Sequence, residues 1–237
     1  TEQASLAGFG DVPSDAWYAA DMAKALRMKT FRGDAAGRLR PEDTITRQEA
    51  FVVLARAFKI SDGEPAALAA FSDKDDVATW ASGPLAALTA AGYIRGSDGR
   101  INPAAPISRE EFAQIMHNMV GLYISAAGTY TENGTGNVMV NAAGVTLKGL
   151  AVAGDLIIGD GVGDGDVILD GVTVAGRLVV RGGGENSIRL INRSNVGSIS
   201  VGKTGSGGIR VKAEEGCRVD IVYVDDGLGD IILGGVF

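Results

Sequence analysis

Two arginines, Arg47 and Arg109, occupy the same place in two copies of a short pattern, Thr-Arg-Gln-Glu at residues 46–49 and Ser-Arg-Glu-Glu at residues 108–111. Each pattern is a capping box, in which a hydroxyl side chain begins a helix and a glutamate three residues later completes the cap. The start of a helix carries a partial positive charge, so an arginine there is unfavourable for stability. Beside free backbone N–H groups, however, a guanidinium makes a receptor for a carboxylate or a phosphate. We therefore treat both arginines as candidate anion-binding residues.

An ion pair within the chain is the competing explanation for each arginine. Either guanidinium could pair with a nearby glutamate or with an aspartate such as Asp11 or Asp73. Ion pairs at protein surfaces are common and contribute little to stability. The recurrence of the arginine favours the anion site, and the ion pair stays open as the alternative.

Both patterns belong to a longer repeat that fills the first half of the chain with an offset of 62 or 63 residues. Each copy predicts an amphipathic helix from its tryptophan, a glycine-rich turn, a short extended stretch and a second helix that begins at the capping box. We expect one all-α, helix–loop–helix repeat in residues 1–62 and another in residues 63–125. The corresponding residues are Phe9 and Phe71, Asp11 and Asp73, Trp17 and Trp80, Gly33 and Gly96, Pro41 and Pro103, Ile45 and Ile107, Arg47 and Arg109, and Glu49 and Glu111.

The composition changes near residue 125. All six prolines and both tryptophans precede it, whereas glycine and β-branched residues dominate from residue 128 onward. Similar stretches begin at residues 145, 167, 188, 209 and 231, each with short apolar runs between Gly, Asp or Asn turns. One such unit cannot bury its own apolar face, but stacked units can. Residues 126–237 are therefore predicted to form an all-β β-solenoid (β-helix) of about 21–22 residues per coil. One inward column is expected to contain Leu147, Leu169, Leu190, Val211 and Leu233.

Charge and rare residues exclude several classes of protein. The chain has 22 basic and 29 acidic residues, and its net charge of −7 argues against a generic nucleic-acid-binding protein. A single cysteine, Cys217, and a single histidine, His117, exclude an internal disulfide, a cysteine-based zinc site and a multi-histidine metal site. No stretch approaches the ~20 apolar residues that span a bilayer, and the first residues show no signal-peptide pattern.

Two motifs in the second half resemble ligand-binding sequences. Residues 197–204 match the P-loop pattern GxxxxGK[ST], but a repeat strand is predicted between the glycines and no helix after them, so nucleotide binding is not expected. Residues 159–166 (GDGVGDGD) resemble calcium-binding turns, although turn aspartates that bond to their own backbone are the preferred explanation. We therefore predict no cofactor and no metal, with calcium as a weak alternative. The aspartates concerned are Asp160, Asp164 and Asp166, with Asp225, Asp226 and Asp230 at an equivalent corner.

The repeat of the first half resembles the S-layer homology (SLH) motif. The marks are Phe-x-Asp, the tryptophan, the glycine-rich turn, the proline and the (Thr/Ser)-Arg-x-Glu pattern, which are present in both copies over about half of the chain. The resemblance implies binding to secondary cell-wall polysaccharide of a bacterial envelope, often through a pyruvate ketal on a sugar. It also implies that the arginine contacts the ketal carboxylate, while the Trp, Asp and Gly positions shape the groove. The site residues carried over are Arg47, Arg109, Trp17, Trp80, Asp11, Asp73, Gly33 and Gly96.

The number of motifs departs from the family's usual pattern. SLH motifs typically work in threes around a pseudo-threefold axis, and this sequence holds two. A third motif lies outside these residues, comes from a partner chain or is absent, and all three explanations stay open. Each tryptophan is equally explained as the first core residue of its helix. The glycine-rich half resembles β-helical repeats of bacterial surface proteins that also carry SLH motifs.

The favoured function is a non-catalytic, extracellular anchor at the bacterial cell wall or surface layer. The SLH motifs would hold an acidic or pyruvylated secondary cell-wall polysaccharide, and the solenoid would be a surface-displayed structural or interaction module. A polysaccharide-active enzyme that uses the solenoid face is one alternative, although its exposed strand positions hold no paired acids. A purely structural module that self-associates through its SLH motifs or its solenoid ends is the other. Neither a nucleic-acid partner nor a membrane span is expected.

Overall fold

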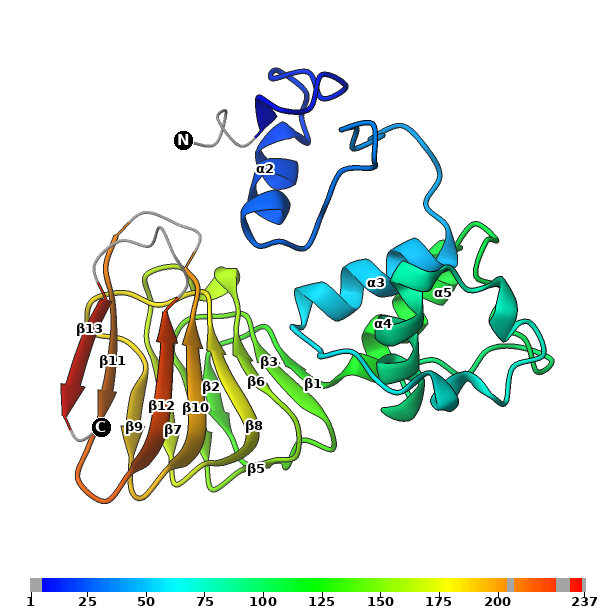
Figure 1. Ribbon diagram of the computed structural model, residues 1–237. Coiled ribbons are helices and arrows are strands. Elements are labelled where there is room, and N and C mark those ends of the chain that lie inside the picture. The colour runs from blue at the N-terminus through cyan, green and yellow to red at the C-terminus, as the bar shows by residue number, and fades with distance from the viewer. Residues whose placement is uncertain (1–5, 204–206, 225–230, 236–237) are drawn as a thin grey trace. The chain divides into compact units, whose positions relative to one another are not determined.

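A computed structural model of the chain describes residues 6–203, 207–224 and 231–235. The chain divides into two compact parts, which we call the helical unit (residues 1–118) and the solenoid (residues 119–237) (Figure 1). Within the described ranges, no helix has both the length and the apolar character that a membrane span requires.

Each repeat of the helical unit holds two of the described α-helices. The first repeat has α2 (Ala19–Arg27) and α3 (Arg47–Ala57), and the second has α4 (Thr79–Ala90) and α5 (Arg109–Met119). The short 3₁₀ helices η1 (Pro65–Leu68) and η2 (Lys74–Asp76) precede α4. Helix α3 packs against α4, and both bury apolar residues at helical spacing. The buried apolar residues are Ala50, Phe51, Val52, Leu54 and Ala55 on α3, and Ala81, Leu85, Ala86 and Leu88 on α4.

Both predicted capping boxes are confirmed. The Thr46 side chain accepts a hydrogen bond from Glu49 N, and Glu49 Oε2 accepts one from Thr46 N at 2.8 Å. Ser108 and Glu111 exchange the same two bonds at the start of α5. The caps therefore place the arginine that follows each hydroxyl at the first position of its helix.

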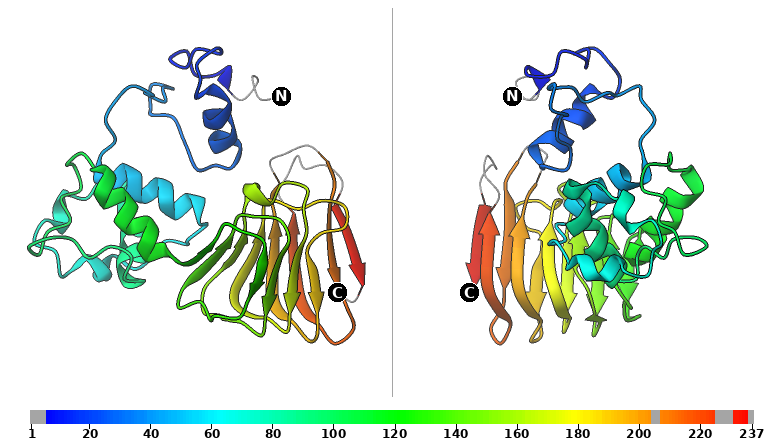
Figure 2. Two further views of the ribbon diagram at one scale, coloured as in Figure 1. Left: turned by 180° about the vertical axis from the view of Figure 1, so that it is seen from behind. Right: turned by 45° about the vertical axis from the view of Figure 1, so that its right-hand side comes forward.

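The second half of the chain is a β-solenoid, as predicted, in which the chain alternates between two sheets of parallel strands. One sheet runs in the order β1-β3-β6-β8-β10-β12, with β5 also paired to β8, and the other runs β13-β11-β9-β7-β4-β2. Figure 2 shows the strands stacked coil on coil. The strands of the first sheet are β1 (Val120–Ile124), β3 (Asn137–Val140), β5 (Ala151–Val152), β6 (Leu156–Ile158), β8 (Thr173–Val180), β10 (Asn195–Val201) and β12 (Arg218–Val224). Those of the second are β2 (Gly128–Tyr130), β4 (Val145–Lys148), β7 (Val167–Asp170), β9 (Arg189–Ile191), β11 (Ile209–Ala213) and β13 (Ile231–Gly235), and the 3₁₀ helix η3 (Asp160–Val162) follows β6.

The inward column of the solenoid has one change of register. Leu169 pairs with Leu147 on one side and with Leu190 on the other, as predicted. The next neighbour of Leu190 is Ala213, so the expected pairing with Val211 is wrong. A shift of two residues keeps the same face inward because side chains alternate along a strand. Leu147, Leu169, Leu190, Val211 and Ala213 are all fully buried.

Replacing Leu169 with alanine is expected to lower the free energy of unfolding by about 2–5 kcal/mol, because truncation of a fully buried leucine leaves a cavity. Leu233 is the matched control, since it points inward on β13 at the end of the same sheet but is 45% exposed. Leu233→Ala should cost distinctly less. Thermal unfolding followed by circular dichroism would measure both losses, and equal losses would contradict the stacked column.

Candidate functional site

The start of α3 is docked on the segment of the second repeat that precedes α5, residues 101–107. Arg47 N donates a hydrogen bond to Ala105 O at 2.8 Å, and Gln48 N donates one to Pro103 O at 3.0 Å. The first N–H groups of a helix have no acceptor within the helix itself. At α3 the second repeat supplies these acceptors. We call this contact the inter-repeat joint.

Two further hydrogen bonds extend the inter-repeat joint. Ile107 N donates to Ile45 O at 3.1 Å, so the segment before α5 also binds the segment before α3. The Gln48 side chain accepts a hydrogen bond from Ala78 N at 3.0 Å. Because Ala78 directly precedes α4, the starts of α3 and α4 are tied together.

The guanidinium of Arg47 lies buried in the inter-repeat joint. Its Nε donates to Ile101 O at 2.8 Å, and its Nη1 is paired with Glu111 Oε1. Its Cζ lies 5.2 Å from the centre of the Phe51 ring, at which distance the cation attracts the ring electrons. The side chain keeps 10% of its surface exposed, and Nη2 has no acceptor among the described residues. Arg47 therefore holds a carboxylate of the other repeat and not that of its own capping box.

Glu111 joins the cap of α5 to the inter-repeat joint. Its Oε2 accepts a hydrogen bond from Ser108 N at 2.9 Å, while its Oε1 pairs with Arg47. The backbone N–H of Ser108 and the charge of Arg47 hold the pKa of Glu111 below its ordinary value, although burial acts in the opposite direction. The carboxylate is therefore ionised at neutral pH, where it can serve both partners.

Asp73 holds the segment on which the inter-repeat joint is built. Its carboxylate accepts hydrogen bonds from Ile101 N at 2.9 Å and from Asn102 N at 2.8 Å. The residue is 5% exposed. Burial acts to raise the pKa of Asp73, but the two backbone hydrogen bonds outweigh it and the pKa lies below its ordinary value. Ile101 is thus fixed from both sides, at its N–H by Asp73 and at its carbonyl by Arg47.

Asp11 forms the same clamp in the first repeat. Its carboxylate accepts hydrogen bonds from Arg40 N at 2.7 Å and from Leu39 N at 3.0 Å. The bond from the Arg40 backbone is the main reason why the pKa of Asp11 is lowered. Both aspartates therefore use their carboxylates to shape the chain before the second helix of their repeat.

Gly33 and Gly96 make room for the phenylalanine of the Phe-x-Asp mark. A Cβ atom at Gly33 would collide with the Phe9 ring, and one at Gly96 would collide with the Phe71 ring and the Arg100 carbonyl. Gly96 also has a φ of +66°, a conformation that favours glycine. Both glycines thus let an aromatic ring close against the turn.

Both tryptophans are exposed at the starts of the first helices of their repeats. Trp17 is 89% exposed and packs edge-on against the Tyr18 ring, with 5.4 Å between the ring centres. Trp80, the second residue of α4, is 52% exposed. These side chains are therefore not core residues. Each leaves a large aromatic surface available to a ligand.

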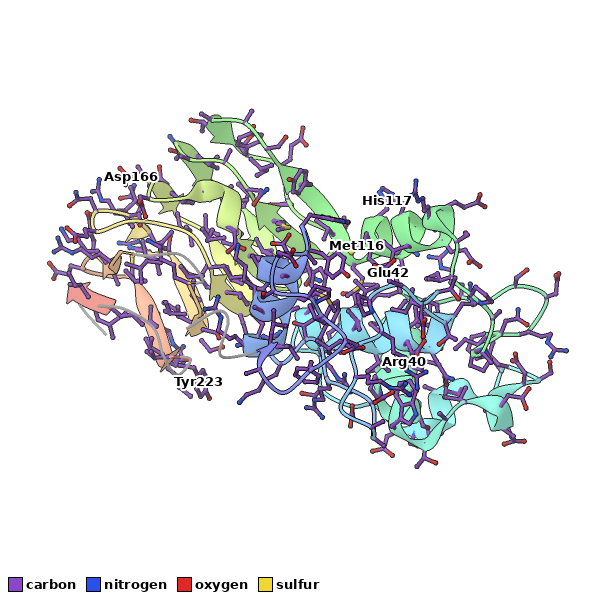
Figure 3. The ribbon with its side chains drawn as sticks, turned by 90° about the horizontal axis from the view of Figure 1, so that it is seen from above. Arg40, Glu42, Met116, His117, Asp166 and Tyr223 are labelled. Atoms are coloured by element: carbon purple, nitrogen blue, oxygen red, sulfur yellow. The ribbon has the colours of Figure 1, made fainter. Side chains whose placement is uncertain are left out.

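Arg109 is exposed at the start of α5. In the part of the chain that the structure describes, no residue accepts a hydrogen bond from its guanidinium or from the backbone N–H groups of Arg109 and Glu110. Of the two equivalent helix starts, that of α3 is occupied by the second repeat and that of α5 is open. His117, on the last turn of the same helix, is exposed (Figure 3).

The structure thus brings only some of the predicted site residues together. Arg47 and Asp73 meet at Ile101, and Trp80 follows Ala78 at the same joint. The roles of Glu111, Gln48 and Ile101 in the joint were not predicted. The sequence feature that could have indicated the Arg47–Glu111 pair is the repeat. An arginine and a glutamate recur in each repeat, so they can pair between repeats as well as within one.

Neither the acidic motif nor the P-loop match of the solenoid gathers a cluster of metal-binding side chains in the described ranges. No group of three or more His, Cys, Asp or Glu side chains there could hold a metal ion, and Asp164 instead accepts a hydrogen bond from Lys203 Nζ at 2.7 Å. Lys203 Nζ also donates to Gly183 O at 2.8 Å. Residues 197–201 of the P-loop match lie in β10, as predicted. Thr204 and the aspartates at 225, 226 and 230 lie outside the described residues.

Comparison with known proteins connects this helical unit to a family. The model of the S-layer homology domain matches residues 8–51 and 70–113, which contain all eight predicted site residues. The chain is 35% identical over 116 residues to the surface-layer 125 kDa protein of Lysinibacillus sphaericus. It is 28% identical over 123 residues to exoglucanase XynX of Acetivibrio thermocellus, and 28% identical over 116 residues to amylopullulanase of Thermoanaerobacterium thermosulfurigenes. These alignments cover 47%, 50% and 47% of this chain but only 10%, 11% and 6% of the respective relatives.

Asp73→Asn is expected to lower the unfolding midpoint of the helical unit by several degrees at pH 7, because the amide cannot accept both backbone hydrogen bonds as the carboxylate does. Folding lowers the pKa of Asp73, so the unfolded chain takes up this proton at a higher pH than the folded chain. The stabilising effect is present above the ordinary pKa of 3.8 and is lost as the pH falls through the lower pKa of the folded state. The difference between wild type and variant should therefore shrink below about pH 4.

Asp75→Asn is the matched control for this measurement, since the Asp75 side chain is 89% exposed and, among the described residues, pairs only with the neighbouring Lys74. Thermal unfolding across pH 2–7 would follow all three proteins. A constant difference between wild type and Asp73→Asn over this range would contradict the clamp.

Proposed function

We propose that this chain, which carries two S-layer homology domains, is a cell-surface anchor that binds wall polysaccharide. Support comes from the matched region, which it shares with a protein named for a surface layer and with two proteins named as polysaccharide-cleaving enzymes. Because this region occurs both in proteins named as enzymes and in a protein that is not, its role is best assigned to a task that does not depend on catalysis. We therefore assign it non-catalytic attachment to secondary cell-wall polysaccharide outside a bacterial cell.

The observation that carries the proposed site is the exposed Trp80 at the start of α4, because a hydrogen bond ties this helix start to that of α3, where the orientation of Arg47 is fixed. Gln48, the residue after Arg47, holds Ala78 in place, and Trp80 lies two residues further on. An indole ring offers a large apolar surface on which a sugar ring can lie. The inter-repeat joint thus combines a platform for a sugar with a cation for an acidic substituent such as a ketal carboxylate.

Arg47 is suited to this task because its orientation is set before a ligand arrives. A guanidinium has five N–H donors in a rigid plane, and Ile101 and Glu111 engage only Nε and Nη1. The donors of Nη2 remain for a carboxylate of the polymer. A group that is already fixed loses little conformational entropy on binding, so these hydrogen bonds are used efficiently.

The other predicted site residues support the polymer-binding site from within. Asp73 and Gly96 shape the segment that Arg47 grips, and Asp11 and Gly33 shape its counterpart in the first repeat. The net charge of −7 opposes an anionic polymer at long range. Salt limits this repulsion to roughly 8 Å, so local contacts decide binding. The solenoid serves as the displayed structural or interaction module.

Trp80→Ala is expected to weaken binding to purified cell walls at least several-fold, because the aromatic platform is lost. Tyr223→Ala is the matched control, since Tyr223 is an aromatic residue of the solenoid with nearly the same exposure, 54% against 52% (Figure 3). Co-sedimentation with walls, before and after chemical removal of their non-peptidoglycan polymer, measures the effect. Equal binding by both variants, or binding that survives removal of the polymer, would overturn the proposal.

Arg47→Lys is expected to weaken wall binding by about ten-fold, since lysine keeps the charge that faces Glu111 but loses the planar fork of donors. Arg95→Lys, at an exposed arginine of the second repeat, should leave wall binding unchanged. The same co-sedimentation assay compares the two variants. Wild-type affinity of a correctly folded Arg47→Lys protein would exclude a direct contact between this guanidinium and the polymer.

A further inference from the structure

The open start of α5 presents the donors that α3 uses in the inter-repeat joint. At α3, the backbone N–H groups of Arg47 and Gln48 and the Arg47 guanidinium all have acceptors in the second repeat. Their counterparts at α5 are the N–H groups of Arg109 and Glu110 and the Arg109 guanidinium. None of these has an acceptor within the described ranges. A complete set of donors is thus exposed on one side of the helical unit.

The first repeat presents the matching acceptors. Arg47 and Gln48 bind the carbonyls of residues 101, 103 and 105, whose counterparts are those of Leu39, Pro41 and Asp43. Within the described ranges no hydrogen bond reaches these three carbonyls. Figure 3 marks Arg40 and Glu42, which lie in this segment.

The carboxylate and the apolar residue of the joint have counterparts in the first repeat as well. Glu49 corresponds to Glu111, and among the described residues it caps α3 without a cationic partner. Ile45 corresponds to Ile107 and is 41% exposed. We call residues 39–49 the acceptor segment.

The acceptor segment already has the shape that the joint requires. Asp43 N donates to Arg40 O at 3.2 Å, as Ala105 N donates to Asn102 O at 3.2 Å in the second repeat. Arg40 has a φ of 49° and Asn102 a φ of 50°. The clamp by Asp11 repeats that by Asp73. Little reorganisation is therefore needed to receive a helix start here.

We propose that a second copy of this chain docks the start of its α5 on the acceptor segment of the first copy, in a repeat of the inter-repeat joint. Arg109 N would bind Asp43 O, Glu110 N would bind Pro41 O, and the Arg109 guanidinium would bind Leu39 O and Glu49. The charges of Arg109 and Glu49 are complementary, as those of Arg47 and Glu111 are.

The partner is a second copy because, among the described residues, the chain leaves both the donors at α5 and the matching acceptors of the first repeat unused. Ile45 and Ile107 already face each other in the inter-repeat joint. Asp43 and Arg109 lie two residues beyond them, yet the structure records no bond from Arg109 N to Asp43 O. A contact that joins different surfaces of two copies is head-to-tail, so one copy keeps an unused donor set and the other an unused acceptor segment for further copies.

Assembly would also complete a second polymer site, an expectation that rests on the proposed function. In the existing joint, Gln48 binds Ala78 N and so holds the start of α4 near Trp80. The counterparts are Glu110 of one copy and Asp15 N, close to Trp17, of the other. Arg109 and Trp17 would therefore form their site only between copies.

Sedimentation velocity of the full chain over a range of concentrations tests the assembly directly. The wild-type chain should associate with rising concentration up to about 100 µM. Arg109→Glu should raise the dissociation constant at least ten-fold, because like charges would then face each other at Glu49. Arg95→Glu, an equal charge change at an exposed arginine of the same repeat, should associate as the wild type does. A monomeric wild-type chain, or unchanged association of Arg109→Glu, would overturn the proposal.

Glu49→Gln provides a second variant that keeps the cap of α3, because glutamine also completes a capping box. It should weaken association without lowering the unfolding midpoint appreciably, whereas association at wild-type strength would count against the Arg109–Glu49 pair. The outcome is separable from the wall-binding proposal. Glu49→Gln leaves Trp80, Arg47 and Arg109 intact, so a dissociated Glu49→Gln chain should still bind walls through the joint within each copy.

Discussion

The buried guanidinium of Arg47 is the interaction on which the helical unit depends. A charge taken out of water is costly unless hydrogen bonds and an opposite charge replace the solvent, and removal of one partner of such a pair is strongly destabilising. Arg47 meets this requirement only by reaching into the second repeat, to the carbonyl of Ile101 and the carboxylate of Glu111. The position of α3 against the second repeat is therefore fixed by a polar constraint as well as by packing.

This constraint explains why several of the site residues expected from the SLH motif hold the inter-repeat joint in shape and do not face a ligand themselves. Asp73 accepts a hydrogen bond from the N–H of Ile101, whose carbonyl Arg47 binds. Gly96 leaves room for the Phe71 ring to pack against the turn. These residues shape the joint from within, while Trp80 stands exposed beside it. An anchor benefits from this division, because a fixed site spends little of its binding free energy on ordering its own side chains.

Most of the fold, and part of the site, could be predicted from the sequence. The capping boxes at Thr46 and Ser108 and the solenoid follow from local patterns, which depend on residues close in sequence. The partner of Leu190 was missed because a shift of two residues preserves the inward face and leaves no trace in the hydrophobic pattern. The partner of Arg47 was missed because Glu49 and Glu111 are equivalent in sequence, and only tertiary packing selects between them.

A double-mutant cycle between Arg47 and Glu111 tests the central claim most directly. Arg47→Met and Glu111→Gln would be made singly and together, with the free energy of unfolding as the readout, and glutamine would keep the cap of α5. The account predicts that the double variant is at least as stable as the less stable of the two single variants. The coupling free energy between the two side chains should be about 1–3 kcal/mol. Strictly additive losses would mean that the two side chains act independently, and would contradict the role of this pair in joining the repeats.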